Sequence, residues 1–586
     1  MRENTKKSDW QLIRGFFAYM SPYRKWMIYS LFAVPFSIGG TLLNPWLLVK
    51  IVDDYLVVAE IRGLVFMVSL LAGTVVVNYI ADAIYTYSLQ RAGQMAIADM
   101  RIDLYRHSLT LPRKYYDSTP IGVTLSRMTS DGEAIGESVA IGVLSLITDI
   151  IKTIALFAFL FYLSWQLTLV ILCILPPIYF LANLLRNKLR IYYNESREGL
   201  ADATAYLQEC LNGIKTIQLY AAEMKAVRRF KKKNQRFLDA QTKSNIYDSL
   251  LFSVIEGLTS VTMAGIIWIG TGGILKGVVT IGVLVGFINT LNRLFIPIRE
   301  FAQQFALIQR ALSALEHIDR LFAEPSEKEQ LQPLADGDRM CFKTLDFKGV
   351  EFSYHEGTQV LDRVCFSLNR GENIAIVGAT GSGKSTILKL ITKAYNNYQG
   401  SIQLNGRELR DLSKAELFSC TTLMQQDVFL FNESIKFNIS LGRSGIGEEE
   451  VRDAAEFVYA NQFIDRFKEG LDYKIIDNGK NLSAGQAQLI SFARVIAGKS
   501  DLILLDEATS SVDSVTENLI QKATAKIFKE KTVFAIAHRL STIQNSEMIL
   551  VMKEGRIVEQ GNHQELLKRG GYYLQLLKRM EQQETN

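Results

Sequence analysis

The chain has 586 residues, of which 48% are hydrophobic, and a net charge of +5 from 65 basic and 60 acidic residues. This length is too great for one ordinary domain, and so mild a charge argues against a nucleic-acid-binding protein. The five cysteines are scattered without a C-x-x-C pair, which argues against a disulfide framework or a zinc site and indicates reduced thiols.

The first half of the chain is the more apolar, and it contains six runs long enough to cross about 30 Å of hydrocarbon. These runs are expected at 26–50, 62–88, 138–163, 166–186, 247–274 and 280–305. Residues 9–20 place Trp10, Phe16 and Phe17 on one helical face, which is typical of a helix lying in the membrane surface. Charged residues fill the N-terminal stretch and no small-residue cleavage pattern follows, so no cleavable signal peptide is expected.

Two connections between these runs, at 89–137 and 187–246, are long, helix-rich and basic. The outside loops hold few basic residues, chiefly Lys50, Arg62 and Lys276. Because cytoplasmic loops are enriched in lysine and arginine, both termini and both long connections are expected in the cytoplasm. Their helical character predicts that the spans continue well beyond the bilayer.

Several polar side chains fall inside the expected spans. Charges at that depth face a water-filled cavity or pair with another side chain. Asp149 and Lys152, three apart on one helix, can pair with each other. Structural pairing and contact with a transported compound both stay open for the set, which comprises Asn78, Asp82, Asp149, Lys152, Glu256, Asn289, Asn292 and Arg293.

The second half changes character. A polar, proline-containing linker is expected at 321–338, between a transmembrane domain at 1–320 and a second domain at 339–586. Alternating strand and helix patterns after the linker predict an α/β fold. The predicted fold class is therefore a six-helix membrane domain followed by an α/β nucleoside-triphosphatase domain.

The motif that predicts nucleotide binding is an apolar strand at 373–377 followed by G-x-x-x-x-G-K-[ST] and a helical pattern. Glycines in such a loop let backbone N–H groups turn toward phosphates, and the helix N-terminus adds positive potential. Lys384 is expected to reach the β- and γ-phosphates and Ser385 to coordinate Mg²⁺. The expected phosphate-binding residues are Gly378, Ala379, Thr380, Gly381, Ser382, Gly383, Lys384, Ser385 and Thr386.

Carboxylates follow another apolar strand, at 502–505. Asp506 is expected to hold Mg²⁺ through its water shell and Glu507 to polarise the attacking water. His538 ends a third apolar strand, where it is placed to sense the γ-phosphate; a histidine buried in the core is the alternative.

A second candidate for phosphate binding lies at the start of a later helical pattern. Its serine and glycine offer a hydroxyl and free N–H groups to an anion, although a plain N-capped helix would show the same residues. The residues are Ser483, Ala484, Gly485 and Gln486.

GATGSGKST at 378–386, LSAGQ at 482–486, LILLDE at 502–507 and His538 resemble, in order and spacing, the ATPase domain of ABC transporters. With six spans ahead of these motifs, the chain resembles an ABC exporter half-transporter of the bacterial multidrug-resistance type over nearly its whole length. The resemblance implies that two chains dimerise around two ATP molecules. In each site the phosphate loop, Gln426, Asp506, Glu507 and His538 of one chain would face Ser483 to Gln486 of the other.

The resemblance also implies roles that no single motif gives. Tyr354 would stack on adenine, with aromatic core packing as the alternative, and Gln426 would contact Mg²⁺ and transmit its state to the membrane domain. Segments around Asp117 and Glu209–Ile217 would carry the two helices that couple the domains.

The implied activity is ATP-driven efflux of hydrophobic or amphipathic compounds across the bacterial inner membrane. The ATPase domain would lie in the cytoplasm, membrane lipids would surround the spans, and no nucleic-acid partner is expected. A lipid flippase, a peptide or siderophore carrier and an ATP-gated channel or regulator are the alternatives. Ala484 stands where a second glycine is usual and Ala487 where a basic residue is usual, so a heterodimer with a different half-transporter stays open beside a homodimer.

Overall fold

The structure is a computed structural model that describes residues 7–138, 142, 144–275, 277, 279–326, 340–354, 357–443, 445–506, 514–537 and 540–584. It divides into two compact units, one comprising Met1–Tyr105 and Gly122–Ala323, the other Arg106–Ile121 and Glu324–Asn586. Residues 327–338 of the expected linker, Glu507 and His538 lie outside the described residues. The domain boundaries expected at 320 and 338 stay predictions.

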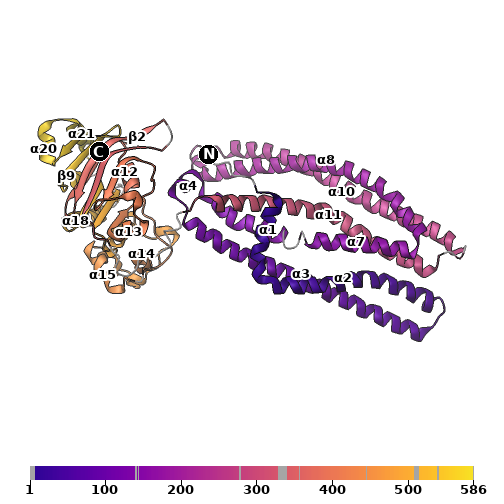
Figure 1. Ribbon diagram of the computed structural model, residues 1–586. Coiled ribbons are helices and arrows are strands. Elements are labelled where there is room, and N and C mark those ends of the chain that lie inside the picture. Colours follow the sequence, from indigo (N-terminus) through magenta and orange to yellow (C-terminus); the bar gives the residue numbers. More distant parts are fainter. Residues whose placement is uncertain are drawn as a thin grey trace. The chain divides into compact units, whose positions relative to one another are not determined.

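The first unit is helical (Figure 1). Its main helices are α1 (Asp9–Met20), α2 (Arg24–Lys50), α3 (Ile61–Leu109), α6 (Gly132–Ser138), α7 (Leu144–Leu163), α8 (Trp165–Asn212), α9 (Ile214–Leu219), α10 (Glu223–Leu275) and α11 (Ile281–Ala323). α7, α8, α10 and α11 share an apolar core that includes Leu160, Ile171, Ile266 and Phe287.

Among the described residues, four segments are long and apolar enough to cross a membrane: Asp9–Leu56, Ile61–Leu109, Leu146–Leu163 and Glu223–Leu275. The predicted runs at 166–186 and 280–305 fall on α8 and α11, where the described apolar stretches are shorter, Trp165–Ile174 and Ile281–Leu291. The membrane-spanning helical domain is confirmed. The number of six spans stays a prediction, because the described apolar stretches of α8 and α11 are too short to count as spans by themselves.

The expectation that the spans continue into the long connections is confirmed. α3, α8 and α10 contain 49, 48 and 53 residues. At 1.5 Å per residue each is roughly 72–80 Å long, more than twice the ~30 Å of hydrocarbon. α8 and α10 pack side by side and are joined through α9 (Figure 1).

Four of the polar side chains expected inside the spans contact other side chains within this unit: Asn78, Asp82, Asp149 and Lys152. Lys152 Nζ lies 3.3 Å from Asp82 Oδ1 on α3, and Asp82 also accepts hydrogen bonds from the side chains of Ser37 and Asn78. Asp149 accepts a hydrogen bond from Gln304 Nε2 on α11 at 2.9 Å. Lys152 therefore pairs with Asp82 of another helix, α3, instead of with Asp149 on its own helix.

The second unit contains two sheets, as the α/β prediction requires. The antiparallel sheet has the order β2-β1-β4-β5, formed by β1 (Thr344–Ser353), β2 (Gln359–Asn369), β4 (Gln399–Leu404) and β5 (Arg407–Glu408). The larger sheet has the order β10-β9-β3-β8-β7-β6, formed by β3 (Asn373–Gly378), β6 (Thr421–Met424), β7 (Leu502–Asp506), β8 (Thr532–Ile536), β9 (Met548–Lys553) and β10 (Arg556–Gly561). Its strands are parallel except β10, which is antiparallel to β9.

The larger sheet is buried on both faces, which explains why its strands read as continuous apolar runs. In β7, Leu502 and Leu504 enter the core shared with the antiparallel sheet, whereas Ile503 and Leu505 enter the core beneath the helices that follow β6. These helices are α14 (Ile435–Ser440), α15 (Glu448–Phe457), α16 (Asn461–Ile464), α17 (Ala484–Ala497) and α18 (Ser514–Glu530). The unit also contains α4 (Arg113–Ser118), α12 (Lys384–Ile391), α13 (Lys414–Cys420), α19 (Leu540–Gln544), α20 (His563–Arg569) and α21 (Tyr572–Glu584).

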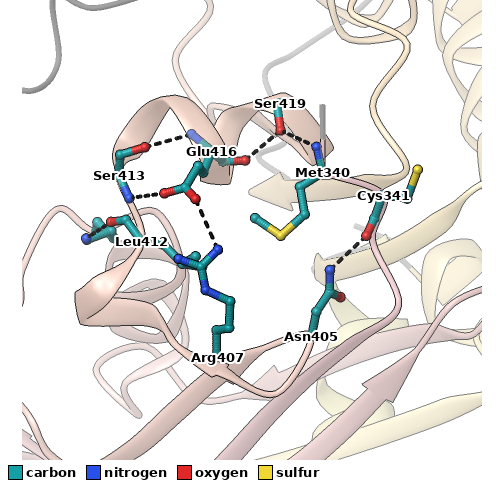
Figure 2. Close-up of polar contacts among 9 residues, drawn as sticks. Met340, Cys341, Asn405, Arg407, Leu412, Ser413, Glu416 and Ser419 are labelled. Atoms are coloured by element: carbon teal, nitrogen blue, oxygen red, sulfur yellow. Dashed lines mark hydrogen bonds and ion pairs between the residues drawn. The ribbon is translucent and has the colours of Figure 1, made fainter. Parts of the chain in front are cut away.

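Polar contacts fix α13 to the edge of the antiparallel sheet (Figure 2). Ser413 caps the helix and forms a reciprocal capping box with Glu416, whose carboxylate also lies 3.1 Å from Arg407 Nη1 on β5. The Met340 N–H donates to Ser419 Oγ at 3.1 Å (Figure 2). The chain ahead of β1 is thereby attached to the same helix.

Candidate nucleotide-binding site

The phosphate loop connects β3 at the centre of the larger sheet to α12. Gly383, just before the helix, has a φ of 102°, and a Cβ there would lie 2.8 Å from Leu361 Cδ2. A Cβ at Gly378 would lie 2.5 Å from the Met552 carbonyl oxygen and 2.7 Å from Ser382 Oγ. The strand, the loop and the helix are those that the motif predicted, and the loop path requires glycine at both positions.

Two buried polar side chains of this loop fit an anion. Lys384 is 7% exposed, and its Nζ donates to the carbonyl oxygens of Gly378 and Ala379 at 2.8 and 3.0 Å. Burial lowers the pKa of Lys384, and the charge of Asp506 partly opposes that shift. Within the described part of the chain, the buried Ser382 Oγ has no hydrogen-bond partner. A bound phosphate would satisfy this hydroxyl and offset the cost of the buried ammonium.

Asp506 lies at the same edge of the sheet as the phosphate loop. It is in register with Ile536 of β8, which is in register with Ile376 of β3. With strands about 4.8 Å apart, β7 runs roughly 10 Å from β3. Burial raises the pKa of Asp506, and the charges of Lys389 and Lys384 oppose this.

That electrostatic setting fits a cation held between Asp506 and phosphates. Over the described residues, no group of three or more His, Cys, Asp or Glu side chains is placed to hold a metal ion by itself. Mg²⁺ in phosphate sites commonly takes one or two protein ligands and completes its shell with phosphate oxygens and water. The exposed Ser385 on the first turn of α12 is the second ligand that the motif predicts.

Gln426 lies two residues after β6, which pairs with β7 up to Met424 and Leu505. It is exposed at the same edge of the sheet. One residue that the sequence reasoning missed holds its loop: the Arg494 side chain donates to the carbonyl oxygens of Phe429 at 3.1 Å and Asn438 at 2.8 Å. Burial lowers the pKa of Arg494. The sequence feature that could have indicated this role of Arg494 is a basic residue within an otherwise apolar helical pattern.

Tyr354 follows β1 and lies beside α12. Its ring meets the rings of Phe352 and Tyr395 edge to face, with centroids 4.9 and 5.1 Å apart, and its Oη is 3.1 Å from Thr386 Oγ1. Lys389 Nζ lies 5.2 Å from the centroid of the Tyr354 ring. The ring thus takes part in aromatic packing, the alternative noted above, while its hydroxyl reaches the phosphate-loop helix. Sequence reasoning singled out neither Lys389 nor Tyr395.

The second phosphate-binding candidate forms a helix cap in this chain. Ser483 Oγ accepts from the Gln486 N–H at 3.2 Å, and Gln486 Oε1 accepts from the Ser483 N–H at 2.9 Å. The Ser483 hydroxyl keeps its own hydrogen for donation. α17 packs against α14, α15 and α18, whereas α12 packs against β3 and β7. A role for Ser483, the exposed Ala484 and the buried Gly485 toward a phosphate of a second chain stays a prediction.

Glu507 and His538 lie outside the described residues. The residues that precede them lie at the edge of the larger sheet that carries the phosphate loop. β7 ends at Asp506, and the Ala537 N–H after β8 donates to the Ile376 carbonyl oxygen at 3.1 Å. Their catalytic roles stay predictions.

Comparison with known proteins matches each half of the chain to a protein family. The ABC transporter transmembrane region family matches residues 27–298, and the ABC transporter family matches residues 361–510. The uncharacterised ABC transporter ATP-binding protein YknV of Bacillus subtilis (strain 168) is 33% identical over 576 residues, covering 98% of this chain and 95% of its own length. The probable multidrug resistance ABC transporter ATP-binding/permease protein YheH of the same organism is 34% identical, covering 88% and 77%.

Two further relatives cover almost the whole chain. An ATP-dependent lipid A-core flippase of Desulfotalea psychrophila (strain LSv54 / DSM 12343) is 30% identical, covering 97% of this chain and 99% of its own length. The solved structure of a bacterial Atm1-family ABC exporter with ATP bound shares the fold, with a TM-score of 0.75 at 24% identity over 95% of this chain and 98% of that chain. The chain therefore belongs to the ABC transporters, as an exporter-type half-transporter in which a membrane-spanning domain is fused to an ATPase that drives transport by hydrolysing ATP.

Proposed function

We propose that this chain is one half of a dimeric exporter that moves hydrophobic or amphipathic compounds out across the bacterial inner membrane. The observation that carries the proposal is the phosphate loop, where the buried Lys384 and the Ser382 hydroxyl, which has no partner among the described residues, share a sheet edge with Asp506. Because membrane-spanning helices lie on the same chain, ATP hydrolysis can drive transport across a membrane.

The residues at the phosphate loop and at the neighbouring sheet edge have different roles in ATP hydrolysis. Lys384 exchanges its bonds to two backbone carbonyl oxygens for bonds to phosphate oxygens. Ser385 and Gln426 would hold Mg²⁺, and Asp506 would hold it through its water shell. Mg²⁺ held there would supply positive charge beside the β- and γ-phosphates. Glu507 accepts the proton of the attacking water, and His538 donates to the γ-phosphate.

A second chain completes each site. One phosphate loop leaves a face of the γ-phosphate open to water, and closing that face supplies donors and excludes solvent. Ser483 to Gln486 of the other chain would provide that closure. The partner is a second copy or a different half-transporter, and the alanines at 484 and 487 support the second possibility.

The proposed orientation places both termini and the ATPase domain in the cytoplasm. Support comes from the basic residues of 89–137 and 187–246, which exceed those of the outside loops. The outward direction, from the side of the ATPase domain or from the inner leaflet, is proposed from the likeness of the fold to that of an Atm1-family exporter.

A lipid flippase of the same fold is the second candidate. The observation that favours it is the D. psychrophila lipid A-core flippase, which matches from end to end, whereas the multidrug-resistance relative covers 88% of this chain. Peptide and siderophore carriers are further alternatives within the fold.

The test uses the full chain reconstituted into liposomes with its ATPase domain outside. ATP-dependent accumulation of an amphipathic fluorescent dye in the lumen would support efflux, and ATP-dependent inward movement of a fluorescent phospholipid without dye accumulation would favour the flippase. Lys384→Ala is the control, because it should abolish both movements. ATP hydrolysis accompanied by neither movement would contradict the proposed substrates while leaving the ATPase assignment intact.

A further inference from the structure

A groove of about 650 Å³ lies between α8 and α10, in the long connection that is expected in the cytoplasm. Two acidic side chains line it, Glu195 on α8 and Asp239 on α10, together with five basic side chains of α10. The basic side chains are those of Arg228, Lys231, Lys232, Arg236 and Lys243. The groove belongs to the first unit, whereas the phosphate loop belongs to the second.

The charged residues share one face of α10 because they recur at helical spacing. They follow one another at steps of three or four residues, at positions 228, 232, 236, 239 and 243, and residue 231 adjoins 232. At 1.5 Å per residue the charged face extends roughly 22 Å from Arg228 to Lys243. Like charges one turn apart on a helix repel each other, so an anion bound along this face would stabilise it.

Close packing of α8 against α10 fixes the walls of the groove (Figure 1). A Cβ at Gly199 of α8 would lie 3.1 Å from Phe237 Cα of α10, so the two backbones approach closely there. Ser196 Oγ donates to Gln241 Oε1 at 2.5 Å across the same interface. The lining residue Ala240 is 6% exposed. The groove therefore has a packed floor beneath its charged rim.

Some of the positive charge is compensated within the protein. Arg236 Nη1 lies 3.6 Å from Asp202 Oδ2 on α8, and Lys243 Nζ lies 5.4 Å from the centroid of the Tyr192 ring. Within the part of the chain that the structure describes, the other three basic side chains of the groove have no hydrogen-bond or ion-pair partner: Arg228, Lys231 and Lys232.

The membrane surface is too distant to neutralise these three side chains. The apolar run of α10 is expected to begin near residue 247, so residues 228–232 lie 15–19 residues earlier, roughly 22–28 Å along the helix. Even with a helix tilt of about 20°, that distance exceeds two Debye lengths of ~8 Å. Membrane orientation depends on the number of basic residues near a span and does not require them to gather in one groove. The charges therefore fit a soluble anion.

We propose that this groove binds a soluble compound carrying a chain of three or more phosphate groups, either free or attached to a nucleoside. Ammonium and guanidinium groups on successive helical turns can contact successive phosphates of one chain, which a single phosphate cannot do. Glu195 and Asp239 weaken the attraction of the groove for anions, so binding requires a multiply charged ligand. The site does not depend on which compound is transported.

The first experiment needs no substitution in its main arm. Exposed lysines of the full chain in phosphatidylcholine nanodiscs are acetylated with and without sodium tripolyphosphate, and each site is followed by mass spectrometry. Tripolyphosphate should slow acetylation of Lys231 and Lys232 several-fold, because an ammonium bonded to phosphate is less free to react. Lys225 and Lys233 are the matched controls, since they lie on the same helix without lining the groove, and their rates should not change.

A second arm distinguishes the two sources of a phosphate chain. ATP replaces tripolyphosphate in the Lys384→Ala chain, where binding at the phosphate loop is weakened. Protection of Lys231 and Lys232 by ATP would extend the site to nucleoside polyphosphates, whereas protection by tripolyphosphate alone would assign it to free polyphosphate.

Paired substitutions then measure the affinity. In the Lys384→Ala chain, Lys231→Gln together with Lys232→Gln should raise the Kd for tripolyphosphate, measured by calorimetry, by roughly 3- to 30-fold, the range for two exposed ion pairs. Lys225→Gln together with Lys233→Gln removes the same charge from the same helix and should change the Kd less than about twofold. Raising NaCl from about 50 to about 300 mM should weaken binding, because added salt screens exposed charges.

Several results would overturn the inference. Equal protection of all four lysines, or an equal loss of affinity in the two paired variants, would show only general attraction to a basic helix. Orthophosphate that binds as tightly as tripolyphosphate would refute recognition of a phosphate chain. Stabilisation by phosphatidylglycerol nanodiscs that requires Lys231 and Lys232, with tripolyphosphate binding unaffected by their replacement, would assign these charges to the membrane.

Discussion

Replacing Lys384 by methionine removes the ammonium group while keeping an unbranched apolar side chain. Without nucleotide, two effects oppose each other: the carbonyl oxygens of Gly378 and Ala379 lose a donor, and a buried charge with a lowered pKa disappears. Each lost hydrogen bond costs about 1 kcal/mol, and relief of desolvation returns a similar amount. The free energy of unfolding of the nucleotide-free protein should therefore change by less than about 2 kcal/mol.

With nucleotide the balance differs, because the ammonium then bonds to charged phosphate oxygens. A hydrogen bond to a charged group contributes about 1.5–3 kcal/mol, so the Kd for ATP should rise by roughly 10- to 150-fold. The assay is equilibrium binding of a fluorescent ATP analogue to the purified full chain, together with the nucleotide-induced rise in unfolding temperature. Both should decrease together because ligand stabilisation depends on the ratio of ligand concentration to Kd.

Lys393→Met is the matched control for this change. Lys393 is also 7% exposed and donates to two backbone carbonyl oxygens, those of Arg410 and Leu412, but it lies two residues beyond the end of α12. It should affect stability without weakening ATP binding. Wild-type affinity in Lys384→Met, or an equal loss of affinity in both variants, would refute the placement of the Lys384 ammonium at the phosphates.

Three further variants test separate parts of the site. Glu507→Gln should still bind ATP but hydrolyse it ~2–4 orders of magnitude more slowly, and a phosphate-release rate above about a tenth of wild type would argue against a catalytic base. Burial raises the pKa of Asp506, so wild-type stability without nucleotide should fall as pH rises through that raised pKa. Asp506→Asn should remove this fall and be the more stable protein at neutral pH, which denaturant unfolding across pH can measure. Arg494→Lys should lose one of the backbone contacts of the guanidinium, destabilise the ATPase domain by about 1–3 kcal/mol and slow hydrolysis, measured by unfolding and ATPase assays.

The local parts of the site could be predicted because their chemistry is local. The strand, loop and helix around Gly378 and Lys384 follow from glycines, a lysine and apolar runs within a few residues of one another. The buried strand before Asp506 could also be predicted, because a central strand of a parallel sheet is apolar on both faces. The same holds for the cap at Ser483, where serine and glutamine three residues apart form the capping box.

Contacts between distant segments could not be predicted, because no local pattern encodes them. The Tyr395–Asp117 hydrogen bond joins residues 278 positions apart, and the Arg494 anchor reaches back 56 positions to Asn438. In the membrane domain, spacing suggested that Lys152 pairs with Asp149, but helix packing places Asp82 of another helix closer. Sequence patterns give the face of a helix and not the neighbour that covers it.

The central claim is that two chains share each ATP site, and complementation between two inactive variants tests it most directly. In a symmetric dimer, Glu507→Gln disables the site of its own phosphate loop, and Ser483→Arg disables the site of the opposite loop. A dimer with one chain of each kind concentrates both defects in one site and leaves the other intact. Dual-affinity purification of these mixed dimers isolates them from the two parent homodimers.

Each parent homodimer should be nearly inactive, whereas the purified mixed dimer should regain ATP hydrolysis, up to about half of the wild-type rate if its two sites act independently. Dual-tag recovery of the mixed dimer confirms that the two chains associate. A mixed dimer that forms but hydrolyses ATP no faster than either parent would contradict the shared site.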